Sequence, residues 1–266
     1  MAWWLLGVAL AGSCPTFRAE LAGVVGIEAL PEASGLVASG RDPARLWSHN
    51  DSGNAAELIA MGLDGALQGI WPVAATALDW EDLARRGDEL LVGDIGDNRG
   101  VRPHVSIWVV TEPIGGPGEP LAAREIRFTY EDGPRDAEVL LVEPGTGRLL
   151  VVSKGRESEH AIYAVPEQGG VAVRVGEVPW VQATPYRTAG DVAPDGSAVI
   201  LRGYTFGWWY PVPESGSLVE ALSAEPCPFP TVPEAQGESV AFGADGMVYT
   251  ASETVGQPLW RYRRVP

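Results

Sequence analysis

The chain has 266 residues, of which 45% are hydrophobic and 20% are charged. This composition is ordinary for a globular protein with a hydrophobic core, and the length suits one large domain or two small ones. The formal net charge of −16 argues against nucleic-acid binding, which requires a basic face.

The N-terminal stretch MAWWLLGVALAGSC contains an apolar run of about ten residues, too short to cross a bilayer and close to a signal-peptide core. We therefore predict that residues 1–14 are a signal peptide or a lipoprotein signal remnant. The protein would then be periplasmic, attached to the cell envelope or secreted. No Lys or Arg precedes the run, and the alternative is a hydrophobic N-terminus with no targeting role. No transmembrane span is expected.

Cys14 and Cys227 are the two cysteines of the chain. Ala11 to Cys14 loosely fits a lipoprotein cleavage site, which would make Cys14 a lipid anchor. Without lipidation, an oxidising compartment would allow Cys14 to pair with Cys227, and cleavage further along would remove Cys14. The sequence leaves these three fates open. Two cysteines cannot build a zinc-ribbon site.

Beyond residue 20 the chain shows alternating apolar runs bounded by Gly, Pro and Asp, which predicts an all-β protein. A polar or acidic pair opens a strand five times. Taking Ser34, Glu81, Glu138, Asp191 and Glu238 as equivalent, the intervals are 47, 57, 53 and 47 residues. A tight turn, a second strand and a third strand follow in each unit, and a fourth strand follows in four units.

The fifth unit ends at Pro266 without a fourth strand, while Ala19 to Ile27 forms a spare strand before the first unit. These patterns predict a five-bladed β-propeller of four-stranded antiparallel blades, with the N-terminal strand completing the last blade. Six blades are the alternative, but they would leave about 42 residues per blade, fewer than any interval observed. We predict a single domain over residues 19–266 and a monomer.

In such a blade the start of the first strand and the end of the second strand lie on the same face. Polar side chains should therefore meet at one mouth of the central channel. The strand starts supply Glu32, Asp79, Glu81, Asp82, Asp136, Glu138, Asp191 and Glu238. The strand ends supply His49, Asn50, Asp51, Asp94, Asp97, Asn98, Lys154, Arg202 and Glu253.

Crowded carboxylates must either keep protons or bind a cation. Calcium suits the predicted ring because it accepts six to eight oxygen ligands in irregular geometry. Transition metals would want more histidine than the three in the chain. The predicted calcium ligands are Asp79, Glu81, Asp94, Asp136, Glu138 and Glu238. The alternative is a purely structural ring of salt bridges and hydrogen bonds, in which Lys154, Arg202 and His49 are counter-charges.

The blocks LWSHNDSG, DWEDLA, GDIGDN, DAEVLLV, SK and QGES resemble the signature of a family of exported bacterial propeller proteins. Most members of that family are uncharacterised, and they are often lipoproteins. The resemblance covers nearly the whole chain after residue 28 and implies a propeller in the cell envelope. More distantly, the pattern is similar to phytase-like and esterase-like propellers, in which calcium at the channel mouth holds a phosphate ester. Those propellers are usually six-bladed and longer.

Two functions follow from these residues. The first is metal-assisted hydrolysis of a phosphate or related ester, with Lys154 and Arg202 stabilising charge and His49 or Glu253 moving the proton. Glu32, Asn50, Asp51, Asp97, Asn98 and Asp191 would contact a small anionic substrate. The second is a non-catalytic propeller that binds an envelope ligand or partner, with calcium as a structural ion. The chain contains no nucleophile elbow, P-loop, Rossmann fingerprint or H-E-x-x-H motif.

Overall fold

The computed structural model describes residues 14–155, 160–179 and 186–265. Nearly all of the regular structure is β, and antiparallel pairing groups the strands into meanders of four. The first meander contains β2 (Ala33–Ala38), β3 (Arg45–Asn50), β4 (Glu57–Gly62) and β5 (Leu67–Ala74). The second contains β6 (Trp80–Arg86), β7 (Glu89–Asp94), β8 (Val105–Thr111) and β9 (Leu121–Tyr130).

The third meander contains β10 (Ala137–Val142), β11 (Leu149–Ser153), β12 (His160–Val165) and β13 (Gly170–Val178). The fourth contains β14 (Ala189–Val192), β15 (Ala198–Arg202), β16 (Gly207–Pro211) and the short β17 (Cys227–Phe229). The fifth contains β18 (Gly237–Phe242), β19 (Val248–Ser252), β20 (Gln257–Val265) and β1 (Thr16–Val25).

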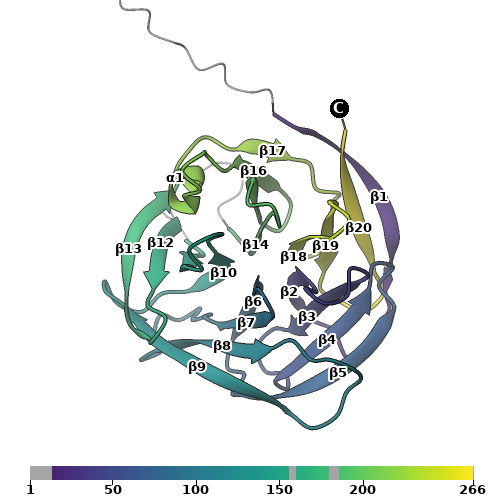
Figure 1. Cartoon of the computed structure of the whole chain (residues 1–266), viewed down its shortest axis with the longest axis horizontal. Coiled ribbons are helices and arrows are strands. Elements are labelled where there is room, and N and C mark those ends of the chain that lie inside the picture. The colour runs from purple at the N-terminus through teal and green to yellow at the C-terminus, as the bar shows by residue number, and fades with distance from the viewer. Residues whose placement is uncertain (1–13, 156–159, 180–185, 266) are drawn as a thin grey trace, which may run out of the picture.

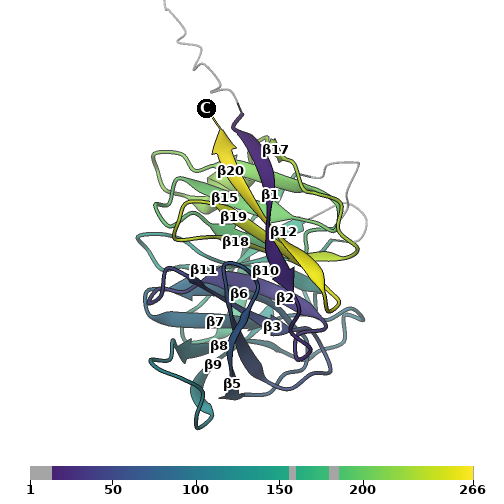
Figure 2. The same cartoon turned by 90° about the vertical axis from the view of Figure 1, so that its right-hand side faces the viewer.

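The five meanders form the blades of a ring around a central axis (Figure 1). Neighbouring inner strands pack on one another in the order β2, β6, β10, β14, β18 and back to β2. The prediction of an all-β propeller is therefore confirmed. The N-terminal β1 completes the fifth blade by antiparallel pairing with β20, from Thr16 opposite Val265 to Val25 opposite Gln257 (Figures 1 and 2). This pairing covers an edge of β20 that would otherwise be exposed.

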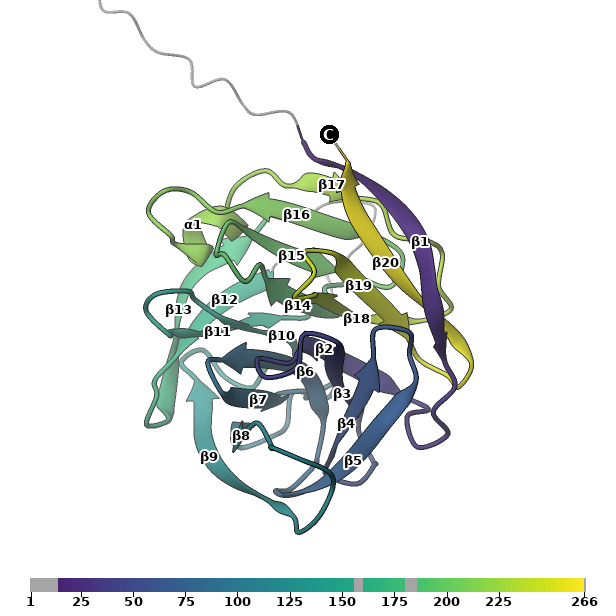
Figure 3. The same cartoon turned by 45° about the vertical axis from the view of Figure 1, so that its right-hand side comes forward.

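Apolar side chains fill the space between neighbouring blades. Trp47, Trp71 and Trp80 are buried between the first and second blades, and the rings of Trp47 and Trp71 meet edge to face at 4.9 Å. A one-turn helix α1 (Leu218–Leu222) lies between the fourth blade and β13, with Leu218, Ala221 and Leu222 buried (Figure 3). Within the described residues, no helix has the length and apolar character needed to cross a membrane.

The predicted signal segment 1–14 lies outside the described residues except for Cys14. The Sγ atom of Cys14 is bonded to Sγ of Cys227, which joins the start of the fifth blade's outer strand to the outer strand of the fourth blade. A lipid thioether would need the same sulfur atom. The disulfide and a lipid anchor at Cys14 therefore exclude each other.

Candidate metal centre at the channel mouth

A β-bulge marks the start of the inner strand in four of the five blades. The register between inner and second strands shifts once between Ser34 and Leu36, Trp80 and Asp82, Ala137 and Val139, and Gly237 and Ser239. A bulge places an extra residue opposite one partner residue and redirects its side chain. The extra residues are Gly35, Glu81, Glu138 and Glu238. In the fourth blade, β14 pairs with β15 without a shift.

Five carboxylates from three blades gather beside these bulges, and we call them the mouth carboxylates. Single carboxylate oxygens of Asp51, Asp79 and Glu81 lie within 4.8 Å of one another. The same holds for Asp51, Glu238 and Glu253. Asp51 directly follows β3 and belongs to both groups, so its carboxylate lies close to acids of the second and of the fifth blade.

The mouth carboxylates are poorly solvated and repel one another. Burial raises the pKa of Asp51 to about 6, and the charges of Glu238, Asp79 and Glu32 act in the same direction. The pKa of Glu81 lies well above its usual range because of burial and the nearby carboxylates of Glu138 and Asp51. Burial and a hydrogen bond with Glu238 raise the pKa of Glu253 to about 9. A bound cation would relieve this repulsion, and so would protons.

The backbone at Gly96 packs directly against two of the mouth carboxylates. A Cβ atom at position 96 would lie 2.1 Å from Oε1 of Glu81 and 2.5 Å from Oδ2 of Asp79. The amide of Gly96 also donates a 3.2 Å hydrogen bond to the carbonyl oxygen of Asp79. Glycine is therefore required here for Glu81 and Asp79 to keep their positions. The oxygen-only donor set fits a hard cation such as calcium.

Glu138 occupies the third glutamate bulge but is paired with Lys154. The Lys154 ammonium forms an ion pair with Oε1 of Glu138. Burial raises the pKa of Glu138 to about 8, and the charge of Lys154 opposes that rise. Lys154 Nζ also lies 6.0 Å from the ring centroid of Tyr186. The pair places the Lys154 ammonium near the mouth carboxylates together with the Glu138 carboxyl, and the two act on the pKa of Glu81 in opposite directions.

The remaining predicted metal ligands hold loops. Asp94 accepts a hydrogen bond from the amide of Asp79 at 3.1 Å and forms a 2.7 Å ion pair with Arg102. Asp136 accepts from the amide of Asp97 at 2.8 Å. Asp97 in turn accepts from the amides of Val101 and Arg102. The oxygens of the stretch GDIGDN therefore organise the loop that carries Gly96, and Asp94 and Asp136 are not part of the carboxylate group.

The other predicted ligand-binding residues of this face also fall into two kinds, those that hold a loop in place and those that are exposed at the rim. Asn50 is buried and joins the backbone of Glu32 to that of Ala29 through hydrogen bonds of 3.1 and 2.7 Å. Glu32 is exposed and accepts a hydrogen bond from Nδ2 of Asn54. Asn98 is exposed at the tip of the loop after β7. Glu32 and Asn98 can thus meet a ligand at the rim, whereas Asn50 is a loop anchor.

The structure contradicts the prediction that Arg202 stabilises charge at the mouth. Its side chain has no exposed surface and forms a 2.6 Å ion pair with Glu234. It also donates to the carbonyl oxygens of Ser239 and Ala251 in the fifth blade. A Cβ at Gly237 would lie 1.7 Å from Nη2 of Arg202, so the chain closes over the guanidinium. Arg202 therefore joins two blades and is not available to a ligand.

His49 is likewise buried beneath the mouth. It has no exposed surface, its Nδ1 lies 2.9 Å from the carbonyl oxygen of Asn50, and its ring meets that of Trp80 at 5.5 Å. Burial lowers the pKa of His49 to about 4, so the ring is neutral at physiological pH. The structure gives His49 a place in the core, out of reach of a proton acceptor on a ligand.

Two acids predicted for the mouth lie further along the channel. Asp82 is fully buried, and its carboxylate accepts hydrogen bonds from the amides of Leu83, Leu140 and Gly190. Asp191 lines a separate cavity among the turns at the other end of the inner strands. The structure therefore does not bring Asp191 to the mouth. The physical reason is that β14 lacks the bulge, so its third residue lies deeper in the channel than the bulge glutamates.

Sequence reasoning placed Asp51 among ligand-contacting residues and did not single out Gly96 or Arg102. The signal for Asp51 was its position directly after a second strand, in the block HNDSG. Nothing in the sequence alone indicated that Asp51 would be the carboxylate shared by both groups.

No protein-family profile matches the chain, and no curated protein sequence matches it. Solved structures do resemble it. The chain aligns over 94% of its length with 100% of the soluble aldose sugar dehydrogenase from Escherichia coli, at 9% identity and a TM-score of 0.54. It aligns over 95% of its length with 97% of a calcium structure of a family AA12 carbohydrate-active enzyme from Trichoderma reesei, at 10% identity and a TM-score of 0.54.

A putative oxidoreductase (glucose dehydrogenase) from Thermus thermophilus is similar over 93% of this chain and 100% of its own, at 12% identity and a TM-score of 0.53. These neighbours are β-propeller enzymes. At such low identities the likeness shows the propeller fold and carries no residue roles.

Proposed function

We propose that this protein is an extracytoplasmic propeller that binds calcium through the mouth carboxylates and uses the bound ion to hold a small anionic ligand. The observation that carries the proposal is the position of Asp51, whose carboxylate belongs to two groups of three acids. Calcium readily accepts several carboxylates from different chain segments because its coordination is large and irregular. Magnesium would retain more water and demand stricter geometry.

An extracytoplasmic location supports a calcium site, because extracellular calcium modules bind the ion with dissociation constants of about 10⁻⁴ to 10⁻³ M. The Cys14–Cys227 disulfide favours an oxidising compartment, as does the resemblance to exported propellers. With its sulfur in the disulfide, Cys14 cannot also be a lipid anchor. Export as a periplasmic or secreted protein is therefore preferred over a lipoprotein.

The anionic nature of the ligand rests on two features of the mouth. A cation held among carboxylates attracts oxyanions to its open coordination positions, and Lys154 lies close by. Tyr204 stands near the same group, within electrostatic range of Glu138, Lys154 and Glu238, and burial raises its pKa to about 12. It is therefore a neutral hydroxyl that can donate a hydrogen bond to a bound carboxylate or phosphate.

The second candidate function is hydrolysis of a phosphate or related ester at the same place. Calcium would supply polarisation of the ester. Lys154 would stabilise negative charge, and Glu253 would donate a proton to the leaving group only where it is not itself a ligand of the ion, because a coordinated carboxylate carries no proton. Burial of His49 and Arg202 removes two of the four predicted catalytic groups, so ligand binding is the function that the geometry supports better.

Calorimetric titration of the purified protein with calcium tests the proposal. Asp51→Asn removes the shared ligand and should weaken calcium binding by about tenfold or more. Glu119→Gln, in an exposed loop outside the mouth, is the matched control and should leave binding unchanged. No calcium binding by the folded wild-type protein, or equal binding by Asp51→Asn, would refute the site. Calcium-dependent release from generic phosphoester substrates, abolished by a chelator, would favour the hydrolase over the binding module.

A further inference from the structure

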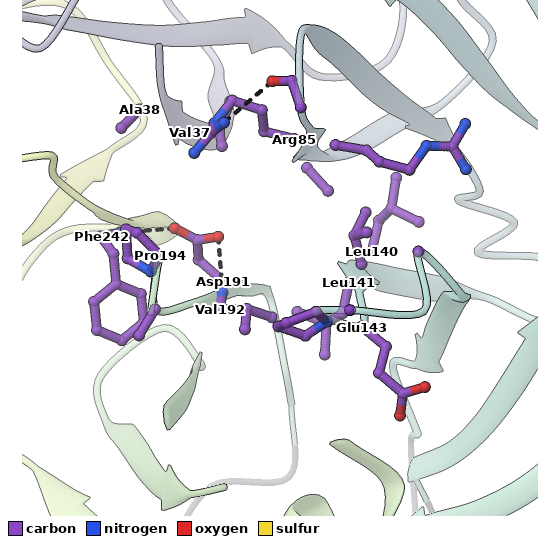
Figure 4. A pocket seen from close by; sticks show the side chains of 18 of the residues that line it. Val37, Ala38, Arg85, Leu140, Leu141, Glu143, Asp191, Val192, Pro194 and Phe242 are labelled. Carbon is purple, nitrogen blue, oxygen red and sulfur yellow. Dashed lines mark hydrogen bonds between the residues drawn. The ribbon is translucent and has the colours of Figure 1, made fainter. Parts of the chain in front are cut away.

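A cavity opens at the opposite end of the channel from the mouth carboxylates, between the turns that join inner and second strands. It has a volume of about 400 Å³ and is lined by parts of all five inner strands, from β2, β6, β10, β14 and β18 (Figure 4). This volume falls within the range of small-molecule sites, which are mostly apolar with a few convergent polar groups. Val37, Leu140 and Val192 supply apolar wall.

Asp191 extends into this cavity from one wall (Figure 4). Its Oδ2 accepts a hydrogen bond from the amide of Phe242 at 2.7 Å, and its Oδ1 accepts from the amide of Val192 at 2.8 Å. The carboxylate is thus fixed in orientation by two rigid strands. Each carboxylate oxygen can accept a further hydrogen bond, so acceptor capacity remains on the cavity side.

Arg85 lies along the opposite wall (Figure 4). Its Nη1 donates to the carbonyl oxygen of Gly87 at 3.1 Å, the one hydrogen bond that the guanidinium makes to the described residues. Burial raises the pKa of Asp191 to about 7, and the charge of Arg85 opposes that rise, although the two groups form no direct ion pair. A guanidinium carries five N–H donors, so most of them remain available.

The other charged side chains of the lining have partners of their own. Arg86 is paired with Glu89 at 2.8 Å and with Glu167 at 2.7 Å. Glu143 accepts hydrogen bonds from the amide of Leu218 at 3.1 Å and from Oγ1 of Thr146 at 2.9 Å. Asp191 and Arg85 are therefore the two opposite charges that face a ligand across the cavity, whose wall is part polar and part apolar.

From this arrangement we propose that the cavity is a binding site for a small zwitterion, whose ammonium group meets Asp191 and whose carboxylate meets Arg85. Both contacts are charge-assisted hydrogen bonds, which are stronger than neutral ones. The apolar walls between the two charged groups suit a short methylene chain between the two ends of the ligand. This site is separate from the mouth carboxylates and does not depend on calcium.

Calorimetric titration with zwitterions of increasing length tests the proposal and also measures the charge separation that the site accepts. The probes are glycine, 4-aminobutanoate and 6-aminohexanoate, with butylammonium and butanoate as analogues that lack one charge. We expect one zwitterion to bind about tenfold or more tightly than either analogue, with or without EDTA. Failure of every zwitterion to bind, or equal binding of the single-charge analogues, would overturn the proposal.

Two variants assign the ends of the ligand. Arg85→Gln should weaken the binding of the preferred zwitterion and of butanoate, and it should leave the binding of butylammonium unchanged. Asp191→Asn should weaken the binding of the zwitterion and of butylammonium, and it should leave the binding of butanoate unchanged. Arg148→Gln removes an exposed guanidinium from a turn on the same face and should change nothing. If Asp191→Asn does not fold, Arg85→Gln still decides: unchanged affinity for the zwitterion in folded Arg85→Gln protein would disprove the assignment.

Discussion

The Asp82 carboxylate accepts a hydrogen bond from the backbone amide of Leu140 at 2.9 Å, so the second blade holds the third from inside the channel. The same Oδ2 atom lies 3.4 Å from the amide nitrogen of Gly190 in the fourth blade, and Oδ1 accepts from Leu83. One side chain thereby satisfies amides on three of the five inner strands.

Asp82→Ala should therefore destabilise the ring. Leaving a buried amide without an acceptor costs about 1–3 kcal/mol, and we expect a loss of at least that size in the free energy of unfolding measured in urea. Asp88→Asn, in the turn of the same hairpin, removes a surface ion pair with Arg41 and should change stability by less than about 1 kcal/mol. Equal losses in the free energy of unfolding for the two variants would contradict the conclusion that Asp82 stabilises the ring by joining three blades.

Stability of the calcium-free protein should fall as pH rises from about 6.5 to about 9. Burial raises the pKa of Glu138 to about 8 and of Glu253 to about 9, above the values of an unfolded chain near 4.3. The folded state therefore holds more protons than the unfolded state in this range, and deprotonation opposes folding. Below pH 6.5 the lowered pKa values of His49 and His160, both about 4, act in the opposite direction.

Thermal denaturation in EDTA across this pH range measures the effect, and the same series with calcium is the comparison. Because calcium replaces protons on the mouth carboxylates, its stabilising effect should grow with pH. A melting temperature that rises from pH 6.5 to 9 in EDTA would show that the pKa values of these carboxyls are not raised in the folded state.

Gly96→Ala should weaken calcium binding without removing a ligand. The added methyl group would overlap Oε1 of Glu81 and Oδ2 of Asp79, so both carboxylates would have to move. We expect an affinity loss of about tenfold by calorimetry, about 1.4 kcal/mol. Gly116→Ala is the matched control, since nothing lies within 4 Å of a Cβ at that position. Unchanged affinity in folded Gly96→Ala protein would mean that Glu81 and Asp79 do not bind the ion.

Replacing Cys14 and Cys227 together by serine should lower the free energy of unfolding by about 2–5 kcal/mol, the usual cost of losing a native disulfide from a secreted domain. The bond closes a loop of 213 residues, nearly the whole ring. The two single variants should behave like the double variant if the thiols pair with each other. Calcium binding at the mouth should be retained, and its loss in the folded double variant would show a coupling between the disulfide and the mouth that this structure does not explain.

The propeller was predictable because strand alternation and turn chemistry repeat five times in the chain. Burial was harder to predict. His49 and Arg202 lie in the last residues of second strands, and Asp51 directly follows one, so sequence position alone predicted the mouth for all three. The guanidinium of Arg202 is paired with Glu234, which lies in a loop 32 residues further along the chain, and this pairing allows the guanidinium to be buried. A polar residue at a strand end carries no local signal of where its partner lies.

Register was the second limit. The equivalence of Ser34 and Asp191 with the bulge glutamates assumed that every blade pairs in the same way. In the first blade Gly35, with a φ of 64°, occupies the bulge, and in the fourth blade the bulge is missing. A one-residue difference decides which side chain faces the channel mouth, and composition does not reveal it.

Neighbouring blades are joined at the outside of the ring in three different ways. Parallel pairing of β5 with β9 and of β9 with β13 joins the first three blades into one continuous sheet. Helix α1 lies across the boundary between the third and fourth blades, and the disulfide spans the boundary between the fourth and fifth. A reducing environment would therefore loosen one boundary selectively. In a cell compartment that lacks an oxidant, the boundary between the fourth and fifth blades would depend on noncovalent contacts alone, such as those of Arg202 with the carbonyl oxygens of Ser239 and Ala251.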